Sequence, residues 1–282
     1  MRDLKGIFPG VFTMGNMFCG FLAIIACVRG ADPAEPAWLI VLAVFLDILD
    51  GRVARLSNSA SRFGVELDSL ADLVSFAVAP AVMLYSYKLV TFGNWGWILG
   101  FIYIMAASFR LARFNLQAGL ETKRNFIGLP VPAAAFSLAT YVIFSQNVWG
   151  EVRLEKLAVT MVIGFALLMV SSIEYESNPD ISPKSKAGIF RLLFLTISVA
   201  ALIYKPRYAL FMLSMIYVSS GLVREGYILV KQMYSSPNNT NGANPANKYK
   251  RRRKSRNKEK DDDGKSLRFP EDRGDRSTGT DH

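Results

Sequence analysis

Residues 47–72 read DILDGRVARLSNSASRFGVELDSLAD and carry four aspartates inside a part of the chain whose flanks are almost wholly apolar. Carboxylates at membrane depth are costly, so they are rarely retained there without a function. At about 100° per residue, Asp47 and Asp50 share one face of a helix, and Asp68 and Asp72 share one face of a second helix. Two such helices, joined by a short turn, would bring all four side chains into one cluster.

A cluster of four carboxylates predicts a site for divalent cations. Four like charges in one pocket stay ionised only when strongly positive groups lie among them. Hard oxygen ligands that leave room for water and phosphate oxygens suit Mg²⁺ or Mn²⁺, with Ca²⁺ as a competitor. The alternative is a solvated helix–turn–helix whose acids merely face water, and the apolar stretches on both sides argue against it.

The spacing of these acids, D-x2-D-G-x2-A-R-x8-G-x3-D-x3-D, resembles the signature of the CDP-alcohol phosphotransferase family at all eight fixed positions. Members of this family pass a phosphatidyl group from a CDP-linked lipid to an alcohol and release CMP. The resemblance implies a core of six membrane helices and two bound divalent ions, Mg²⁺ or Mn²⁺, held by Asp47, Asp50, Asp68 and Asp72. It also implies that Asp72 is the catalytic base that takes the proton from the attacking hydroxyl.

Residues between and beside the acids are the candidates for binding CDP. They are Gly51, Ala54, Arg55 and Gly64 within the signature, together with Thr13 and Asn16 on the first apolar segment. Small side chains let a phosphate or a flat ring approach the backbone closely, and an arginine adds positive charge opposite a diphosphate. Small residues also serve tight helix packing in membranes, and a threonine and an asparagine can instead form hydrogen bonds between helices. Both alternatives remain open from spacing alone.

Further segments resemble membrane-type phosphatidylserine synthases within that family, over roughly residues 8–232. They are Pro9-x3-Thr13-x2-Asn16-x3-Gly20 and residues 66–81, 108–115 and 128–132. Departures occur at Ala77, where glycine is usual, and at Gly10, where asparagine is usual. The resemblance implies CDP-diacylglycerol as donor, L-serine as acceptor and a homodimer.

The serine carboxylate needs a cationic partner, and the candidates for the serine pocket are Arg110, Arg113 and Asn115. The two arginines can equally anchor the chain at the membrane interface, and the asparagine can equally cap a helix. Charge does not exclude a phosphorylated acceptor, because the same basic residues would suit glycerol 3-phosphate or inositol phosphate. Serine is favoured by the resemblance alone.

Long apolar stretches recur along the 282 residues, of which 51% are hydrophobic, and each is near the roughly 17–25 residues that cross a bilayer. We place spans at residues 11–28, 34–55, 65–87, 94–114, 130–149, 155–173, 188–204 and 206–230. The last two are divided at Pro206, since proline cannot continue a helix interior. The sequence therefore predicts an all-α polytopic membrane bundle of about eight transmembrane helices, six in the family core plus two, with six or seven as the alternative count.

Lysine and arginine are distributed unevenly over the connections between these spans. With both termini in the cytoplasm, the inner connections hold most of them, while the outer ones hold only Arg29, Lys88, Arg153, Lys205 and Arg207. Positive charge favours the cytoplasmic side. We therefore predict a multi-pass protein of the cell membrane (the plasma or inner membrane), with cytoplasmic termini and the acid cluster at the cytoplasmic end of its spans.

Cysteine and histidine usage excludes several kinds of site. Cys19 and Cys27 lie eight residues apart on one predicted helix, about 12 Å at 1.5 Å per residue, which is too far for a disulfide. The chain has a single histidine, His282. A phosphohistidine mechanism with paired H-x-K motifs, or a nucleophile activated by histidine, is therefore excluded.

The C-terminal part differs from the rest of the chain in composition. Residues 248–282 hold 13 of the 33 Lys and Arg and 8 of the 23 Asp and Glu, and Pro, Asn, Gly and Ser crowd residues 235–247. We therefore predict a transmembrane domain at residues 1–234 and a disordered basic tail at 235–282. Such a tail favours anionic lipid surfaces, and we expect no nucleic-acid partner. A cation transporter that uses the intramembrane acids is the alternative from another functional class.

Overall fold

The computed structural model describes residues 4–57, 62–118, 126–153, 155–175, 196, 198 and 200–235. The chain divides into two units, residues 1–227 and 228–282, and every contact discussed below lies within the first. The predicted basic tail falls, apart from Ser235, outside the described residues. Its disorder, and the boundary predicted at residue 234, therefore stay predictions.

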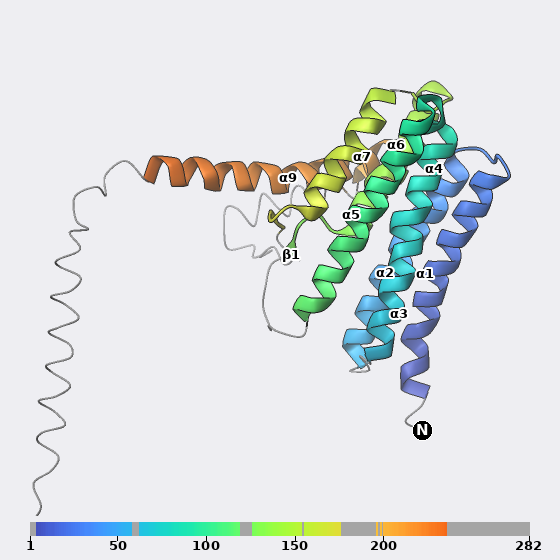
Figure 1. Ribbon diagram of the computed structural model, residues 1–282. Helices are drawn as coiled ribbons and strands as arrows, with labels where there is room; N and C mark the ends of the chain where they lie inside the picture. The colour runs from blue at the N-terminus through green and yellow to red at the C-terminus, as the bar shows by residue number, and fades with distance from the viewer. Residues whose placement is uncertain are drawn as a thin grey trace, which may run out of the picture. The chain divides into compact units, whose positions relative to one another are not determined.

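Helices account for nearly all of the described chain (Figure 1), and the predicted class of a helical membrane bundle is confirmed. Their bounds are α1 Leu4–Val28, α2 Ala34–Ser57, α3 Arg62–Asp72, η1 Leu73–Val78, α4 Ala79–Tyr87, η2 Leu89–Phe92, α5 Asn94–Ala118, α6 Val131–Trp149, α7 Glu155–Val170 and α9 Pro206–Ser235. Of these, α9 begins at Pro206, the predicted break, where proline suits the first turn of a helix.

Three stretches of the described chain are long and apolar enough to cross a membrane, namely Gly10–Val28, Phe63–Tyr87 and Asn94–Leu116. The first lies on α1, the second runs through α3, η1 and α4, and the third lies on α5. Most of the span predicted at residues 188–204 lies outside the described residues. The total of eight spans therefore stays a prediction.

The helix that carries Asp68 and Asp72 continues as one rod from α3 into α4, but its hydrogen bonding changes directly after Asp72. Segment η1 is a π-helical turn, with the amide of Ala79 donating to the carbonyl of Val74. The hydroxyl of Tyr103, on α5, donates to the Phe76 carbonyl inside this turn at 3.0 Å. Such π-helical insertions are frequent at functional sites.

Helix α1 packs along α2 and along the α3–α4 rod (Figure 1). At Gly20 the two backbones approach so closely that an added Cβ would lie 2.6 Å from Cα of Ser75. The Ser75 hydroxyl donates to the carbonyl of Asn16 at 2.8 Å. A glycine is therefore required where α1 meets the π-helical turn, and this contact sets the position of the neighbouring polar residues of α1. Cys19 and Cys27, also on α1, are buried free thiols.

A short antiparallel ladder joins two connections, and the sequence did not predict it. Strand β1, Phe126–Ile127, pairs with β2, Glu174–Tyr175. Gly128 follows with a φ of +79° and donates its amide to the Ile173 carbonyl at 2.8 Å. Strands of two residues leave no periodic pattern, which is why the ladder had no signal in the sequence.

Candidate active site

Three of the four predicted ligands converge in the structure. Asp47 of α2, Asp68 of α3 and Asp72, the last residue of α3, each place one carboxylate oxygen within 4.8 Å of the other two. Asp72 is buried, whereas Asp47 and Asp68 are partly exposed. One side of the group is therefore open to a ligand, and the other is closed by the helix bundle.

Asp50 lies beside this group but is not part of it. Its Oδ2 accepts a hydrogen bond from the Thr13 hydroxyl on α1, and its carboxylate interacts electrostatically with those of Asp47 and Asp68. Its Oδ1 is buried and, among the described residues, has no hydrogen-bond partner. A neighbouring helix thus holds one oxygen of Asp50, and the other remains available.

Asn16, one turn after Thr13 on α1, forms a similar hydrogen bond to the carboxylate of Asp72. Its Nδ2 donates to Oδ1 of Asp72 at 3.2 Å, and its own Oδ1 is buried with no partner in the described part of the chain. The side chains of Thr13 and Asn16 therefore form hydrogen bonds between helices, one of the two roles that the sequence left open. Contacts of either residue with CDP stay predictions.

The donor set suits a divalent cation. Three aspartates offer converging carboxylate oxygens, and two further buried oxygens nearby, Asp50 Oδ1 and Asn16 Oδ1, have no hydrogen-bond partner among the described residues. A buried acceptor without a donor is costly, unless a cation or water satisfies it. Hard oxygen ligands are what Mg²⁺ and Mn²⁺ prefer. The side chains present therefore fit the ions that the sequence predicted.

Arg110 of α5 is the buried cation that faces this acidic group. Its guanidinium interacts electrostatically with Asp72 and with the hydroxyl of Tyr217 on α9, and it lies 5.8 Å from the ring centroid of Phe114. Its Nε is buried without a hydrogen-bond partner among the described residues. A buried guanidinium with a free donor, next to the predicted catalytic base, is suited to bind an anionic substrate group.

Arg113 is one turn away from Arg110 but serves another part of the fold. Its guanidinium donates to the carbonyls of Met169, Val170 and Ser171 at 3.2–3.3 Å, at the C-terminal end of α7. A cation is favourable there because the last carbonyls of a helix have no partner within it. These bonds hold Arg113 at the end of α7, and its predicted contact with serine stays a prediction.

Asn115, the third residue of the predicted serine pocket, contacts the helix of the acids. Its Nδ2 donates to the Ser69 hydroxyl at 2.9 Å, and Ser69 directly follows Asp68. Asn115 therefore joins the end of α5 to α3. Its described bonds position the acid-bearing helix.

The predicted CDP-binding residues of the signature lie at the end of α2 and the start of α3. Gly51 is exposed and Gly64 is partly exposed, so both backbones are accessible. The side chains of Ala54 and Arg55 lie outside the described residues. The proposed contacts of all four with a nucleotide stay predictions.

Several residues of this region were missed by reasoning from the sequence. Ser69 bonds α3 to α5, and Ser75 bonds η1 to α1. The Tyr103 hydroxyl donates to a carbonyl inside the π-helical turn, and Tyr217 interacts electrostatically with Arg110. A small polar residue on an apolar helix was the only signal for the serines. Tyr103 and Tyr217 had no signal, because tyrosines are ordinary residues of membrane interfaces.

Comparisons with known proteins show which family this chain resembles. Residues 6–173 match the model of the CDP-alcohol phosphatidyltransferase family. The CDP-diacylglycerol–serine O-phosphatidyltransferase of Helicobacter pylori strain 26695 is 34% identical over 230 residues, which cover 81% of this chain and 95% of that protein. The enzyme of the same name from Methanocaldococcus jannaschii is 38% identical over 212 residues, covering 75% and 90%.

An archaetidylserine synthase from Methanothermobacter thermautotrophicus is 36% identical over 169 residues, which cover 59% of this chain and 68% of that protein. The family match spans more than half of the chain, including all four aspartates of the quoted stretch. With its acids gathered between α2 and α3, this chain belongs to the CDP-alcohol phosphatidyltransferase family.

Proposed function

We propose that this protein transfers the phosphatidyl group of CDP-diacylglycerol to the hydroxyl of L-serine, giving phosphatidylserine and CMP. The observation that carries the proposal is the convergence of Asp47, Asp68 and Asp72 within 4.8 Å in a chain of this family. The names of the relatives from bacteria and archaea support serine as the acceptor.

Asp47, Asp68 and Asp72, with Asp50 beside them, would hold two divalent cations, Mg²⁺ or Mn²⁺. Such ions, when bound, neutralise the charge of a diphosphate and of the oxygens that attack and depart in an in-line displacement. Asn16 and Thr13 hold two of these carboxylates from α1, so the ligands are oriented before any ion arrives.

In the proposed reaction the serine hydroxyl oxygen forms a bond to the phosphorus that carries diacylglycerol, and the bond from that phosphorus to the bridging oxygen breaks. The electron pair of the broken bond leaves with CMP, and Asp72 accepts the hydroxyl proton. Asp72 suits this role because Asn16 fixes its carboxylate and leaves one oxygen free of that bond.

Arg110 is the residue that we expect to bind the serine carboxylate. It is buried and interacts electrostatically with Asp72, so we expect a serine held by it to present its hydroxyl to the proposed base. Asn115 supports this arrangement through Ser69, and Arg113 is the second candidate. Gly51, Gly64, Ala54 and Arg55 are expected to contact CDP.

We further propose that the protein is a multi-pass cell-membrane protein with cytoplasmic termini, and that it forms a homodimer. The apolar helices and the uneven distribution of basic residues support the orientation. A water-soluble nucleotide and a lipid can both reach an acid cluster at the end of the spans. Residues 235–282 would form the basic tail.

Release of CMP by the purified protein tests the function directly. The protein in detergent micelles containing CDP-diacylglycerol is assayed with serine, glycerol 3-phosphate and inositol phosphate in turn. We expect release with serine only, loss of release with EDTA and recovery when Mg²⁺ or Mn²⁺ is restored. The variant Asp47→Asn serves as the negative control, because it lacks one of the three converging carboxylates.

Each outcome has a separate meaning. Release with glycerol 3-phosphate alone would contradict the choice of serine and leave phosphatidyl transfer in place. Release that survives EDTA would contradict the role of metal ions. No release with any acceptor would favour the alternative of a cation transporter.

A further inference from the structure

The end of the bundle away from the acids contains an open cavity of about 560 Å³. It is lined by Lys88, Arg153, Glu155, Lys156 and Leu157. Lys88 directly follows α4, so about 16 residues of helix, or roughly 24 Å, separate it from Asp72. The cavity is therefore remote from the candidate active site.

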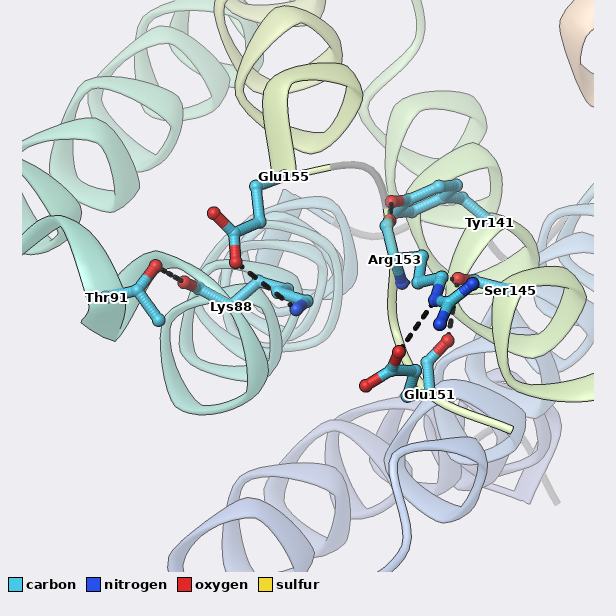
Figure 2. A network of polar contacts seen from close by, with 7 residues as sticks. All are labelled: Lys88, Thr91, Tyr141, Ser145, Glu151, Arg153 and Glu155. Atoms are coloured by element: carbon cyan, nitrogen blue, oxygen red, sulfur yellow. Dashed lines mark hydrogen bonds and ion pairs between the residues drawn. The ribbon is translucent and has the colours of Figure 1, made fainter. Parts of the chain in front are cut away.

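The loop that supplies Arg153 is held firmly by buried side chains of α6 (Figure 2). The Tyr141 hydroxyl donates to the Arg153 carbonyl. The Ser145 hydroxyl accepts from the Arg153 amide at 2.8 Å and donates to the Glu151 carbonyl at 3.0 Å. Val152, between them, is only 2% exposed. This loop is therefore formed in advance, and the position of Arg153 at the cavity does not depend on a ligand.

Positive charge exceeds negative charge at this cavity. Three cations line it, against two carboxylates, that of Glu155 in the lining, whose Oε1 lies 3.4 Å from Nζ of Lys88, and that of Glu151 beside it. Arg153 donates its Nε to Glu151 at 2.7 Å (Figure 2), and this bond lowers the pKa of the Glu151 carboxyl. Pairs with such exposed acids contribute little stability. The two lysines and the arginine thus remain able to bind an anion.

The depth of the cavity points to the kind of anion. Trp95 and Trp97, at the start of α5, are 70% and 56% exposed, close in sequence to Lys88. Exposed tryptophans in a membrane protein gather at the level of the lipid headgroups. The Lys88 side chain is only 18% exposed, so its charged end lies at the cavity while its stem packs against the protein. Lipid phosphates lie at this level.

We propose that this cavity binds the phosphate of an anionic phospholipid from the leaflet opposite the acid cluster, through Lys88, Arg153 and Lys156. The phosphodiester of phosphatidylglycerol has the required charge and lies at the required depth. The site is independent of the catalytic reaction and stays in place if the acceptor alcohol proves to be another. We expect the bound lipid to stabilise the C-terminal end of α4 and the N-terminal end of α7.

Native mass spectrometry of the full chain in detergent tests the site. Phosphatidylglycerol, phosphatidylcholine or inorganic phosphate is added in separate titrations. The variant Lys88→Gln/Lys156→Gln removes two cavity charges. The matched control Lys205→Gln/Arg207→Gln removes two charges at the same end, where Arg207 donates to Asn147, but leaves the cavity lining intact.

We expect the cavity variant to bind phosphatidylglycerol about 25-fold more weakly than the wild type, because each basic residue contributes roughly fivefold. The control variant should stay within about threefold of the wild type, and the single variant Lys156→Gln, whose side chain is exposed, should show an intermediate loss. Equal weakening of phosphatidylglycerol binding in the control variant would overturn the proposal. So would binding of phosphatidylcholine to the wild type as tight as that of phosphatidylglycerol, or displacement of phosphatidylglycerol by inorganic phosphate.

Discussion

Asn16 donates a 3.2 Å hydrogen bond to Asp72 across 56 positions of the chain, from α1 to the end of α3. The contact is possible because Gly20, one turn further along α1, allows that helix to approach η1 closely. A side chain on the first helix therefore orients the carboxylate that we propose as the catalytic base. This relationship leads to the first prediction.

Asn16→Leu should lower kcat for CMP release roughly ten- to a hundredfold, because a hydrogen bond to a charged group is lost and a buried polar site is filled by methyl groups. Steady-state kinetics at saturating Mn²⁺ would measure the loss. Thr13→Ser, which keeps the hydroxyl that donates to Asp50, should behave nearly as the wild type. A wild-type kcat in Asn16→Leu would show that Asp72 does not need this partner.

Asp72→Asn should lower kcat by about 10²–10⁴-fold while the affinity for CDP-diacylglycerol changes little, because the amide cannot accept the proton. Asp50→Asn should instead raise the Mn²⁺ concentration needed for half-maximal activity, since it removes one negative charge beside the cluster. Binding of the lipid and metal titrations of activity separate the two effects. Unchanged turnover in Asp72→Asn would remove its assignment as the base.

Gly20→Ala should destabilise the protein by about 1–3 kcal/mol, because the new methyl group would overlap Ser75 of η1 and push two helices apart. Gly10→Ala, on the same helix, adds a methyl group with no atom within 4 Å and should leave stability unchanged or slightly higher. Thermal inactivation of the two variants in the same detergent measures the difference. Equal stability of both would mean that α1 and η1 separate at little cost.

Arg110→Lys and Arg113→Lys should differ in kind. Arg110→Lys should raise KM for serine roughly tenfold, since a lysine lacks the two parallel donors that match a carboxylate. Arg113→Lys should chiefly lower thermal stability, because its guanidinium bridges three carbonyls at the end of α7. Serine KM and thermal midpoints, determined on both variants, test this split. A larger rise of KM in Arg113→Lys would reverse the two assignments.

Removal of residues 236–282 should leave kcat within about twofold of the full chain, because every residue of the candidate site precedes α9 or, like Tyr217, lies in its first half. Binding of the purified protein to anionic vesicles should weaken, as basic residues near a membrane contribute roughly fivefold each. Activity in micelles and vesicle sedimentation measure the two properties. An inactive truncated protein would place the tail in the catalytic machinery.

The spacing of the four aspartates was enough to predict an acidic cluster, and three of them converge in the structure. A helix repeats about every 3.6 residues, so spacings of three and four place acids on one face whatever the rest of the fold does. Apolar stretches likewise predict membrane helices without knowledge of their neighbours. These properties are local, and the structure retains them in α2, α3 and α5.

Partners across helices are decided by tertiary structure, because spacing describes one helix and not the helix that meets it. Packing of α1 pairs Asp50 with Thr13 and Asp72 with Asn16, and the carboxylates of Asp47, Asp68 and Asp72 converge within 4.8 Å. Packing of α5 against α7 gave Arg113 to helix-end carbonyls, while Arg110 faces Asp72.

The kinds of side chain and their order along each helix therefore came from the sequence alone. Contacts between residues that are 37 to 58 positions apart came only from the fold, through close approaches such as that of Gly20 to Ser75. The physical reason is that such contacts depend on how two helix surfaces fit together, and a local stretch of sequence does not determine which surface it will meet.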